Sequence, residues 1–217
     1  MSPSSDPVRA ERAALSDALE QAGPDAPTGC AGWTAADLAA HLVARERRLD
    51  AGPGILLPPL AFYTEFVRRR TLRERTFAEL VALFRGGPPK FSPYALPGVD
   101  ENANGVEFFV HHEDVRRARP DWEPRELGAA LEETLWRRIK IARFVLRKVP
   151  VELTLVRPDG RAARVTGGGR RSAGGARVHG PVGELVLWTL GRTDVARVQI
   201  TGATAAVKTL DESGWSL

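Results

Sequence analysis

The chain has 217 residues, which is enough for one large domain or two small ones with a buried core. Its 31 Lys and Arg against 27 Asp and Glu give a net charge of +4, and 43% of its residues are hydrophobic, as in ordinary globular proteins. No apolar run is as long as a membrane helix, and the first residues lack the basic and apolar regions of a signal peptide, so we expect a cytoplasmic protein with no membrane partner.

Cysteine usage and charge narrow the range of partners further. The one cysteine, Cys30, excludes an intrachain disulfide and an all-cysteine zinc cage. A net charge of +4 lies within the range that solubility alone explains, and the sequence contains no recognisable nucleic-acid-reading motif. We therefore do not expect a nucleic-acid partner.

The N-terminal two thirds of the chain reads as helical. Apolar residues recur at helical spacing in five segments, which are residues 7–22, 34–49, 60–85, 100–118 and 125–148. Thr34 is followed three residues later by Asp37, a spacing typical of a capping box at the start of a helix. Clusters of Pro and Gly separate the segments. The pattern predicts a helical bundle with up to five helices.

The pattern changes at Pro150. Alternating residues predict strands, a hairpin turn joins the first two, and a helix is expected to begin at Pro181 and end at Gly191. The expected elements are strands over 151–156, 161–165 and 195–200, a glycine-rich loop over 167–175, and a short helix over 203–211. The sequence thus predicts an α+β protein, with a helical bundle over 1–149 and a small α/β domain over 150–217.

The segment around residues 104–118 is dense in titratable groups. On a helix, Glu107, His111 and Asp114 share one face, whereas His112 points to the far side. Glu and His four residues apart can bind one divalent metal, because carboxylate oxygen and imidazole nitrogen both coordinate zinc. Alone, this spacing is more often a surface ion pair. Here the apolar Phe108 lies between Glu107 and His111 in the sequence, so this helix is not a purely solvent-exposed one.

A third ligand is available from the second helix. His41 sits at the edge of an apolar stripe, where a histidine is more often a packed core residue. A helical bundle, however, builds metal sites from side chains on different helices. His41 with Glu107 and His111 would leave a coordination position open, as in catalytic zinc sites, and the same set suits iron or nickel.

Two motifs resemble a known family. The segment from Cys30 through Trp33 and Asp37 to His41 resembles the first metal-ligand helix of the DinB-like superfamily, and within it the mycothiol-dependent maleylpyruvate isomerases of actinobacteria. Residues 107–114 are similar to that family's second motif, E-x-x-x-H-x-x-D. The resemblance extends to about residue 149, and residues 180–192 resemble the small C-terminal domain of many members.

This resemblance implies a four-helix bundle with zinc on His41, Glu107 and His111. It also implies an open site for a thiolate such as that of mycothiol. Members of the superfamily include isomerases, thiol transferases and proteins known only to bind metal. No isomerase-specific substrate residue can be matched in this sequence.

Several other residues have two candidate roles each. Asp114 either orients His111 from behind or pairs with Arg117. Arg45 and Arg117 are candidates to hold a substrate carboxylate, although a solvated face is the commoner role for such arginines. Cys30 is expected to be a small buried residue. The remaining expectations are that Trp33 packs before its helix, and that His179 either faces the site or is a loop histidine without a role.

Three functions follow from these observations. The first is a metal-dependent enzyme that uses a low-molecular-weight thiol on a small organic substrate, as an isomerase or thiol transferase. The second is a non-catalytic metal-binding or thiol-sensing module. The third, a basic nucleic-acid binder, has no motif in its support.

Overall fold

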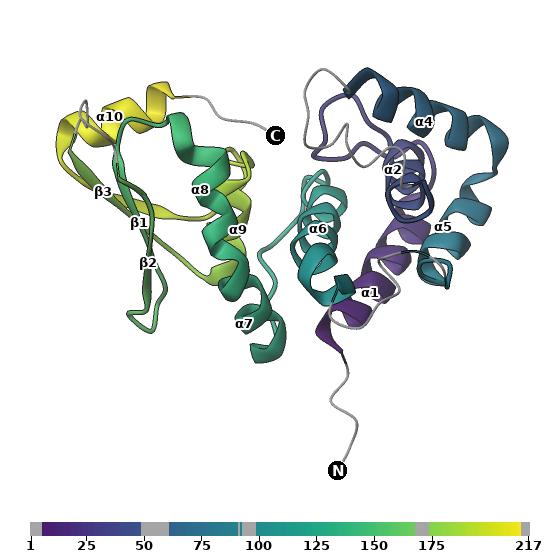
Figure 1. Cartoon of the computed structure of the whole chain (residues 1–217), viewed down its shortest axis with the longest axis horizontal. Coiled ribbons are helices and arrows are strands. Elements are labelled where there is room, and N and C mark those ends of the chain that lie inside the picture. The colour runs from purple at the N-terminus through teal and green to yellow at the C-terminus, as the bar shows by residue number, and fades with distance from the viewer. Residues whose placement is uncertain (1–5, 49–60, 91, 93–98, 168–173, 214–217) are drawn as a thin grey trace, which may run out of the picture. The chain divides into compact units, whose positions relative to one another are not determined.

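The computed structural model describes residues 6–48, 61–90, 92, 99–167 and 174–213. These residues form helices followed by a small mixed sheet with two further helices, an α+β fold as predicted (Figure 1). Their contacts divide the chain into two compact units, Met1–Glu123 and Pro124–Leu217. Among the described residues, no helix has both the length and the apolar character needed to cross a membrane.

The first unit is a helical bundle. α1 packs against α5 and α6, while α2 packs against α4 and α5. The helices are α1 (Pro7–Ala22), α2 (Ala35–Arg47), α4 (Ala61–Glu74), α5 (Phe77–Arg85) and α6 (Val99–Arg116). The predicted helices over 7–22, 34–49 and 100–118 are thus confirmed to within two residues at each end, apart from residue 49, which lies outside the described residues.

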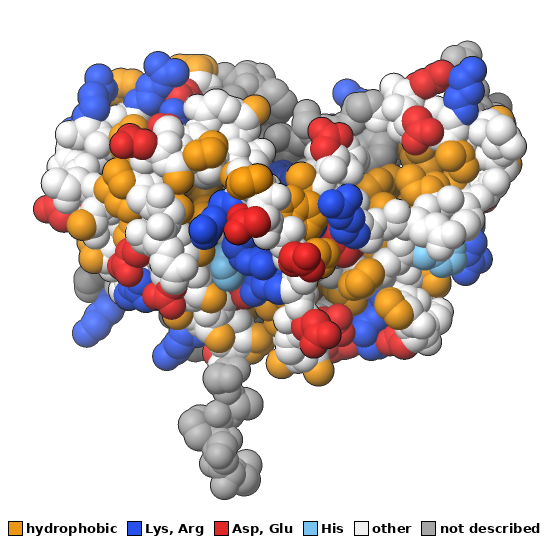
Figure 2. Space-filling model, turned by 180° about the vertical axis from the view of Figure 1, so that it is seen from behind, with side chains coloured by type: hydrophobic (Ala, Val, Ile, Leu, Met, Phe, Trp, Pro, Cys, Tyr) orange, Lys and Arg blue, Asp and Glu red, His pale blue; other side chains and the backbone are white. Residues whose placement is uncertain are grey.

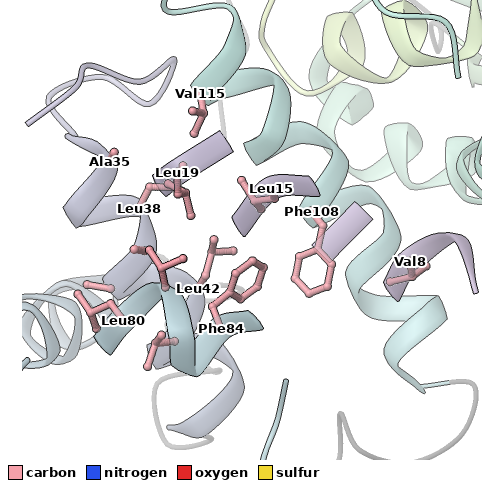
Figure 3. Close-up of a cluster of buried hydrophobic side chains, with 14 residues drawn as sticks. Val8, Leu15, Leu19, Ala35, Leu38, Leu42, Leu80, Phe84, Phe108 and Val115 are labelled. Carbon is pink, nitrogen blue, oxygen red and sulfur yellow. The ribbon is translucent and has the colours of Figure 1, made fainter. Parts of the chain in front are cut away.

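The core of this bundle lies where α1, α2, α5 and α6 converge. Leu15, Leu42, Phe84 and Phe108 are fully buried, and their side chains point toward one another (Figure 3). The rings of Phe84 and Phe108 meet edge to face with centroids 5.1 Å apart, a favoured aromatic geometry. This packing joins α6 to the other helices, so the polar face of α6 is held at a fixed angle to α2.

The predicted helical region over 60–85 is two helices. Thr76 starts α5 with a capping box in which its hydroxyl accepts from the Glu79 N–H and the Glu79 carboxylate accepts from the Thr76 N–H. This box satisfies the free donors of a new helix, so the chain turns at Thr76 instead of continuing. The same T-x-x-E spacing was readable in the sequence.

The second unit holds the sheet and the helices that cover it. The predicted helix over 125–148 is shorter and broken: α7 (Ala129–Arg138) and α8 (Ala142–Val145) are joined and followed by 3₁₀ turns. α7 and α8 pack against α9 (Val182–Thr189) of the same unit. These contacts group residues 124–149 with the strands in one compact unit. The domain boundary between residues 149 and 150 that the sequence suggests stays a prediction.

The sheet has the strand order β2-β1-β3-β4. β1 pairs with β2 antiparallel and with β3 parallel, and β4 pairs antiparallel with β3. The strands are β1 (Glu152–Val156), β2 (Ala162–Gly167), β3 (Gly175–His179) and β4 (Gln199–Gly202), and the helices that follow β3 and β4 are α9 (Val182–Thr189) and α10 (Thr204–Glu212).

One strand of this unit has no counterpart in the sequence-based prediction, and two expectations need correction. The unpredicted strand is β3, since short alternation beside a glycine-rich segment is a weak signal. The strand expected over 195–200 begins at Gln199, because Ala196 N–H instead closes a turn onto Arg192 O. Pro181 is the N-cap of α9 and not its first helical residue. Of the predicted glycine-rich loop, residues 168–173 lie outside the described residues.

Candidate metal centre

The start of α2 places His41. Thr34 and Asp37 form the predicted capping box, in which the Thr34 hydroxyl accepts from Asp37 N–H and the Asp37 carboxylate accepts from Thr34 N–H. Leu38 and Leu42 of the same helix are fully buried in the core. Because these leucines fix the rotation of the helix, His41 lies at the edge of the buried stripe and faces α6.

α6 brings its polar face to the same point. Glu107 Oε1 lies 3.2 Å from His41 Nε2 and 3.3 Å from His111 Nε2. The rings of His41 and His111 meet edge to face with centroids 5.4 Å apart. One ligand atom from each of the three residues lies within 4.8 Å of the other two. The structure therefore brings together the three residues that the sequence indicated, across 66 positions of the chain.

The charges at this point are strongly coupled. Burial disfavours the charged Glu107, but Arg45 and the two histidines hold the pKa of its carboxyl well below the usual range. Burial lowers the pKa of His41, so this imidazole is neutral at pH 7. Burial also acts against charge on His111, yet hydrogen bonds with Asp114, Cys30 and Glu107 raise the pKa of this imidazole well above its usual value.

Asp114 holds the other side of His111. His111 Nδ1 donates to Asp114 Oδ2 at 2.9 Å, and the same oxygen accepts from the Cys30 thiol at 3.2 Å. With Nδ1 carrying a proton toward Asp114, Nε2 is directed to Glu107 and His41. Asp114 thus contacts His111, which is the first of the two roles weighed for it.

The turn before α2 closes over Asp114. Gly29 N–H donates to the backbone oxygen of Asp114 at 2.8 Å. A Cβ on residue 29 would lie 2.7 Å from Asp114 Oδ1, so the approach requires glycine. The next residue, Cys30, contacts both Asp114 and His111. Its sulfur donates to Asp114 Oδ2 and lies 3.7 Å from His111 Nδ1. The sequence favoured a small buried residue at Cys30 and left a role at the site open, because no local pattern links it to a helix 84 positions away; in the structure Cys30 is half-buried.

Arg45 contacts the same carboxylate. Its Nε lies 3.4 Å from Glu107 Oε1, and its guanidinium donates to the side chain of the fully buried Asn104. The sequence offered Arg45 as a group for a substrate carboxylate. In the structure this guanidinium is engaged with Glu107, one turn beyond His41, and it offsets the negative charge of the site.

Trp33 forms part of the wall beside His41. The two rings have centroids 5.1 Å apart, and the Arg68 guanidinium lies 4.8 Å from the centroid of the Trp33 ring. Arg68 also pairs with the capping carboxylate of Asp37. The cation on the ring and the ion pair on the cap fix the indole against the helix start, so Trp33 both packs there and borders the candidate site.

The remaining candidates lie elsewhere. His112 points away from His111, as the helical spacing predicted, and pairs with Glu11 of α1 at 2.8 Å. Arg117 pairs with Glu113 and lies over Trp122, so its guanidinium is engaged about a turn and a half beyond His111. His179 belongs to the second unit, where its Nε2 lies 3.1 Å from Thr201 Oγ1.

The donor set fits a divalent ion. Two ligands about 2 Å from a tetrahedral zinc ion lie about 3.3 Å apart, and the distances from Glu107 Oε1 to the two Nε2 atoms are 3.2 and 3.3 Å. Cys30, His111 and Asp114 form a second cluster of metal-ligand type. In that cluster the thiol and Nδ1 both donate to Asp114 Oδ2, which already satisfies these three groups without an ion.

The family model that describes the mycothiol maleylpyruvate isomerase N-terminal domain, which is part of the DinB-like superfamily, matches residues 6–139. The chain belongs to this family. No curated protein and no solved structure matches the chain.

Proposed function

We propose that the protein is a zinc-dependent cytoplasmic enzyme that uses a low-molecular-weight thiol of the mycothiol type on a small organic substrate. His41, Glu107 and His111 are the proposed ligands. The observation that carries the proposal is the convergence of two imidazole Nε2 atoms on one carboxylate oxygen at 3.2 and 3.3 Å. Membership of a family described by a mycothiol isomerase domain supports the thiol and the isomerase or transferase chemistry.

His41, His111 and Asp114 have different roles in such a site. A bound divalent ion would lower the pKa of a thiol, so that a nucleophile is available at neutral pH. His41 is ready to coordinate, since burial keeps it neutral. Asp114 accepts from His111 Nδ1, so the second proton that the raised pKa of this imidazole retains lies on Nε2, where a bound metal ion would displace it. Three protein ligands leave room for a thiol.

Arg45 has a different part in this scheme. Its contact with Glu107 keeps that carboxylate ionised and oriented. The same guanidinium lies at the candidate site, where the carboxylate of an organic acid would be attracted to it. We place the substrate on the side of the site bordered by Arg45 and Trp33, and we assign nickel and iron as the alternative ions.

Metal content tests the ligand set. Protein purified without a histidine tag and reconstituted with zinc is expected to hold about one ion per chain by mass spectrometry, and Glu107→Ala and His41→Ala are expected to lose it. His179→Ala is the matched control, since His179 lies in β3 and contacts Thr201. Equal zinc in all variants, or none in the parent, would refute the site.

Cobalt substitution tests the thiol. Addition of mycothiol to the cobalt-loaded parent is expected to produce a sulfur-to-cobalt charge-transfer absorption, and the same addition to Glu107→Ala is not. Turnover of maleylpyruvate or another electrophilic organic acid by the zinc-loaded parent would establish the enzyme. Thiol coordination without turnover across such substrates would instead favour a thiol-sensing module, the second candidate, which the thiol of Cys30 beside His111 also suits.

A further inference from the structure

A second feature of the chain lies in the other unit and has no part in the proposed metal chemistry. Between Thr134 and Val151 the sequence contains six Lys or Arg and no Asp or Glu. On the face of the protein that Figure 2 shows, acidic and basic side chains lie among one another. The placement of this run on the folded unit decides what it can do.

The structure sorts this segment into two opposite faces. Leu135, Ile139, Ala142 and Leu146 are buried in the second unit. The opposite face, which we call the basic face, borders a hollow of about 540 Å³ lined by Arg137, Arg138, Lys140, Ile141, Arg143, Phe144 and Arg147. The spacing 137, 140, 141, 144 and 147 is that of one side of a helix.

Two large apolar side chains stand in the middle of these cations. Phe144 is 71% exposed and Ile141 is 44% exposed. Exposure of two such residues in one place is unfavourable, because their apolar surface stays in contact with water. Grouped exposed apolar side chains commonly mark an interaction surface. Flanking cations and a central apolar pair together define an amphipathic surface and not a merely solvated one.

The cations of the basic face have no carboxylate partners among the described residues. Arg137 donates to Glu133 O and Thr134 Oγ1, and Arg147 donates to Phe144 O. By contrast, Arg157 and Arg161 of the same unit are both paired with carboxylates. The positive charge of the basic face is therefore available to an outside anion.

We propose that the basic face binds the surface of an anionic phospholipid bilayer. Phe144 and Ile141 enter the boundary between headgroups and acyl chains, and the surrounding Arg and Lys side chains bind headgroup phosphates, one of which the hollow accommodates. The contact is peripheral and involves no spanning helix. It lies in the second unit and is independent of the metal ligands.

The apolar pair favours lipid over nucleic acid. Contacts to a nucleic-acid backbone need cations alone, and an aromatic ring among them can stack on a base. An aliphatic side chain such as Ile141 has no such partner, whereas a lipid interface buries both side chains. Long Arg and Lys side chains around the pair can extend to the phosphates while their stems cover apolar surface.

Vesicle sedimentation with the full zinc-loaded chain tests the proposal. We expect binding to vesicles of phosphatidylserine and phosphatidylcholine, little binding to phosphatidylcholine alone, and weaker binding as salt rises. Lys140→Glu with Arg143→Glu is expected to weaken binding by at least about twenty-five-fold, since each cation near such a surface contributes about a factor of five. Phe144→Ser is expected to weaken it by about tenfold.

Matched variants separate the basic face from general charge and hydrophobicity. Arg164→Glu with Lys208→Glu makes the same charge change at exposed positions of the same unit, and Phe62→Ser removes a phenylalanine that is also 71% exposed. Both are expected to bind vesicles as the parent does. Equal losses in these controls, no binding to anionic vesicles at low salt, or tighter binding to duplex DNA or RNA would overturn the proposal.

Discussion

The close approach of Gly29 to Asp114 makes a sharp prediction about the candidate metal centre. Gly29→Ala would place a Cβ 2.7 Å from Asp114 Oδ1, whereas ordinary contacts begin at 3.4 Å. The carboxylate therefore has to retreat by about 0.7 Å. A shift of this size along the hydrogen bond between His111 Nδ1 and Asp114 Oδ2, now 2.9 Å, would lengthen it to about 3.6 Å, which is no longer a hydrogen bond.

The consequence is a loss of metal affinity through a residue that touches no proposed ligand. Removal of the partner behind a metal-bound histidine typically weakens binding about tenfold to a hundredfold, and the crowding costs about 1–3 kcal/mol of folding free energy. Zinc titration against a competing chelator measures the affinity, and urea denaturation measures the stability. Gly86→Ala is the control, because its nearest contact would be an ordinary 3.4 Å.

A double variant tests whether Gly29→Ala lowers the zinc affinity through Asp114. If Gly29→Ala acts through Asp114, its loss of affinity should largely disappear in an Asp114→Ala background, since the two changes remove the same interaction. Parent-like zinc affinity in Gly29→Ala would refute the reasoning. So would a loss that adds in full to that of Asp114→Ala, because the effect would then come from the fold and not from the support of His111.

Three further predictions concern stability. In the metal-free protein, the raised pKa of His111 means that its charged form stabilises the fold below about pH 6.5 and that this contribution is lost as pH rises through the raised value. Asp114→Asn should therefore cost more stability at about pH 6 than at a pH above that raised value, and a cost that stays equal as pH rises, by urea denaturation, would contradict this. Phe84→Ala should cost about 3–5 kcal/mol in the same assay, and a loss near zero would contradict its burial in the core. The hydrogen bond from Arg68 lowers the pKa of Glu65 to about 2, so Glu65→Gln should destabilise the protein above about pH 4.5 by no more than about 1 kcal/mol, because the 35% exposed side chain is screened. That difference from the parent should shrink as pH falls toward 2, and a constant difference would exclude the ion pair as its cause.

The local structure of α2 and α6 follows from the sequence. Thr34 and Asp37 mark the start of α2, because the capping box satisfies donors within four residues of chain. Helical spacing puts Glu107 and His111 on one face and His112 on the other, because the side chains of a helix repeat every 3.6 residues. The general architecture of metal sites in helical bundles suggested His41 as the third ligand, the resemblance of the two motifs to one family implied the same set, and the structure brings the three side chains together.

Only the tertiary structure decides what surrounds these side chains. Cys30, Gly29 and Arg45 reach α6 from positions 59 or more residues away, and no local period encodes such contacts. The extent of the sheet was also beyond reach, since β3 is held by its pairing with β1 and β4 and not by a pattern of its own. Spacing along one helix is set by backbone geometry, which the sequence reports directly. Contacts between helices depend on how buried side chains such as Phe84 and Phe108 pack, and that is a property of the whole core.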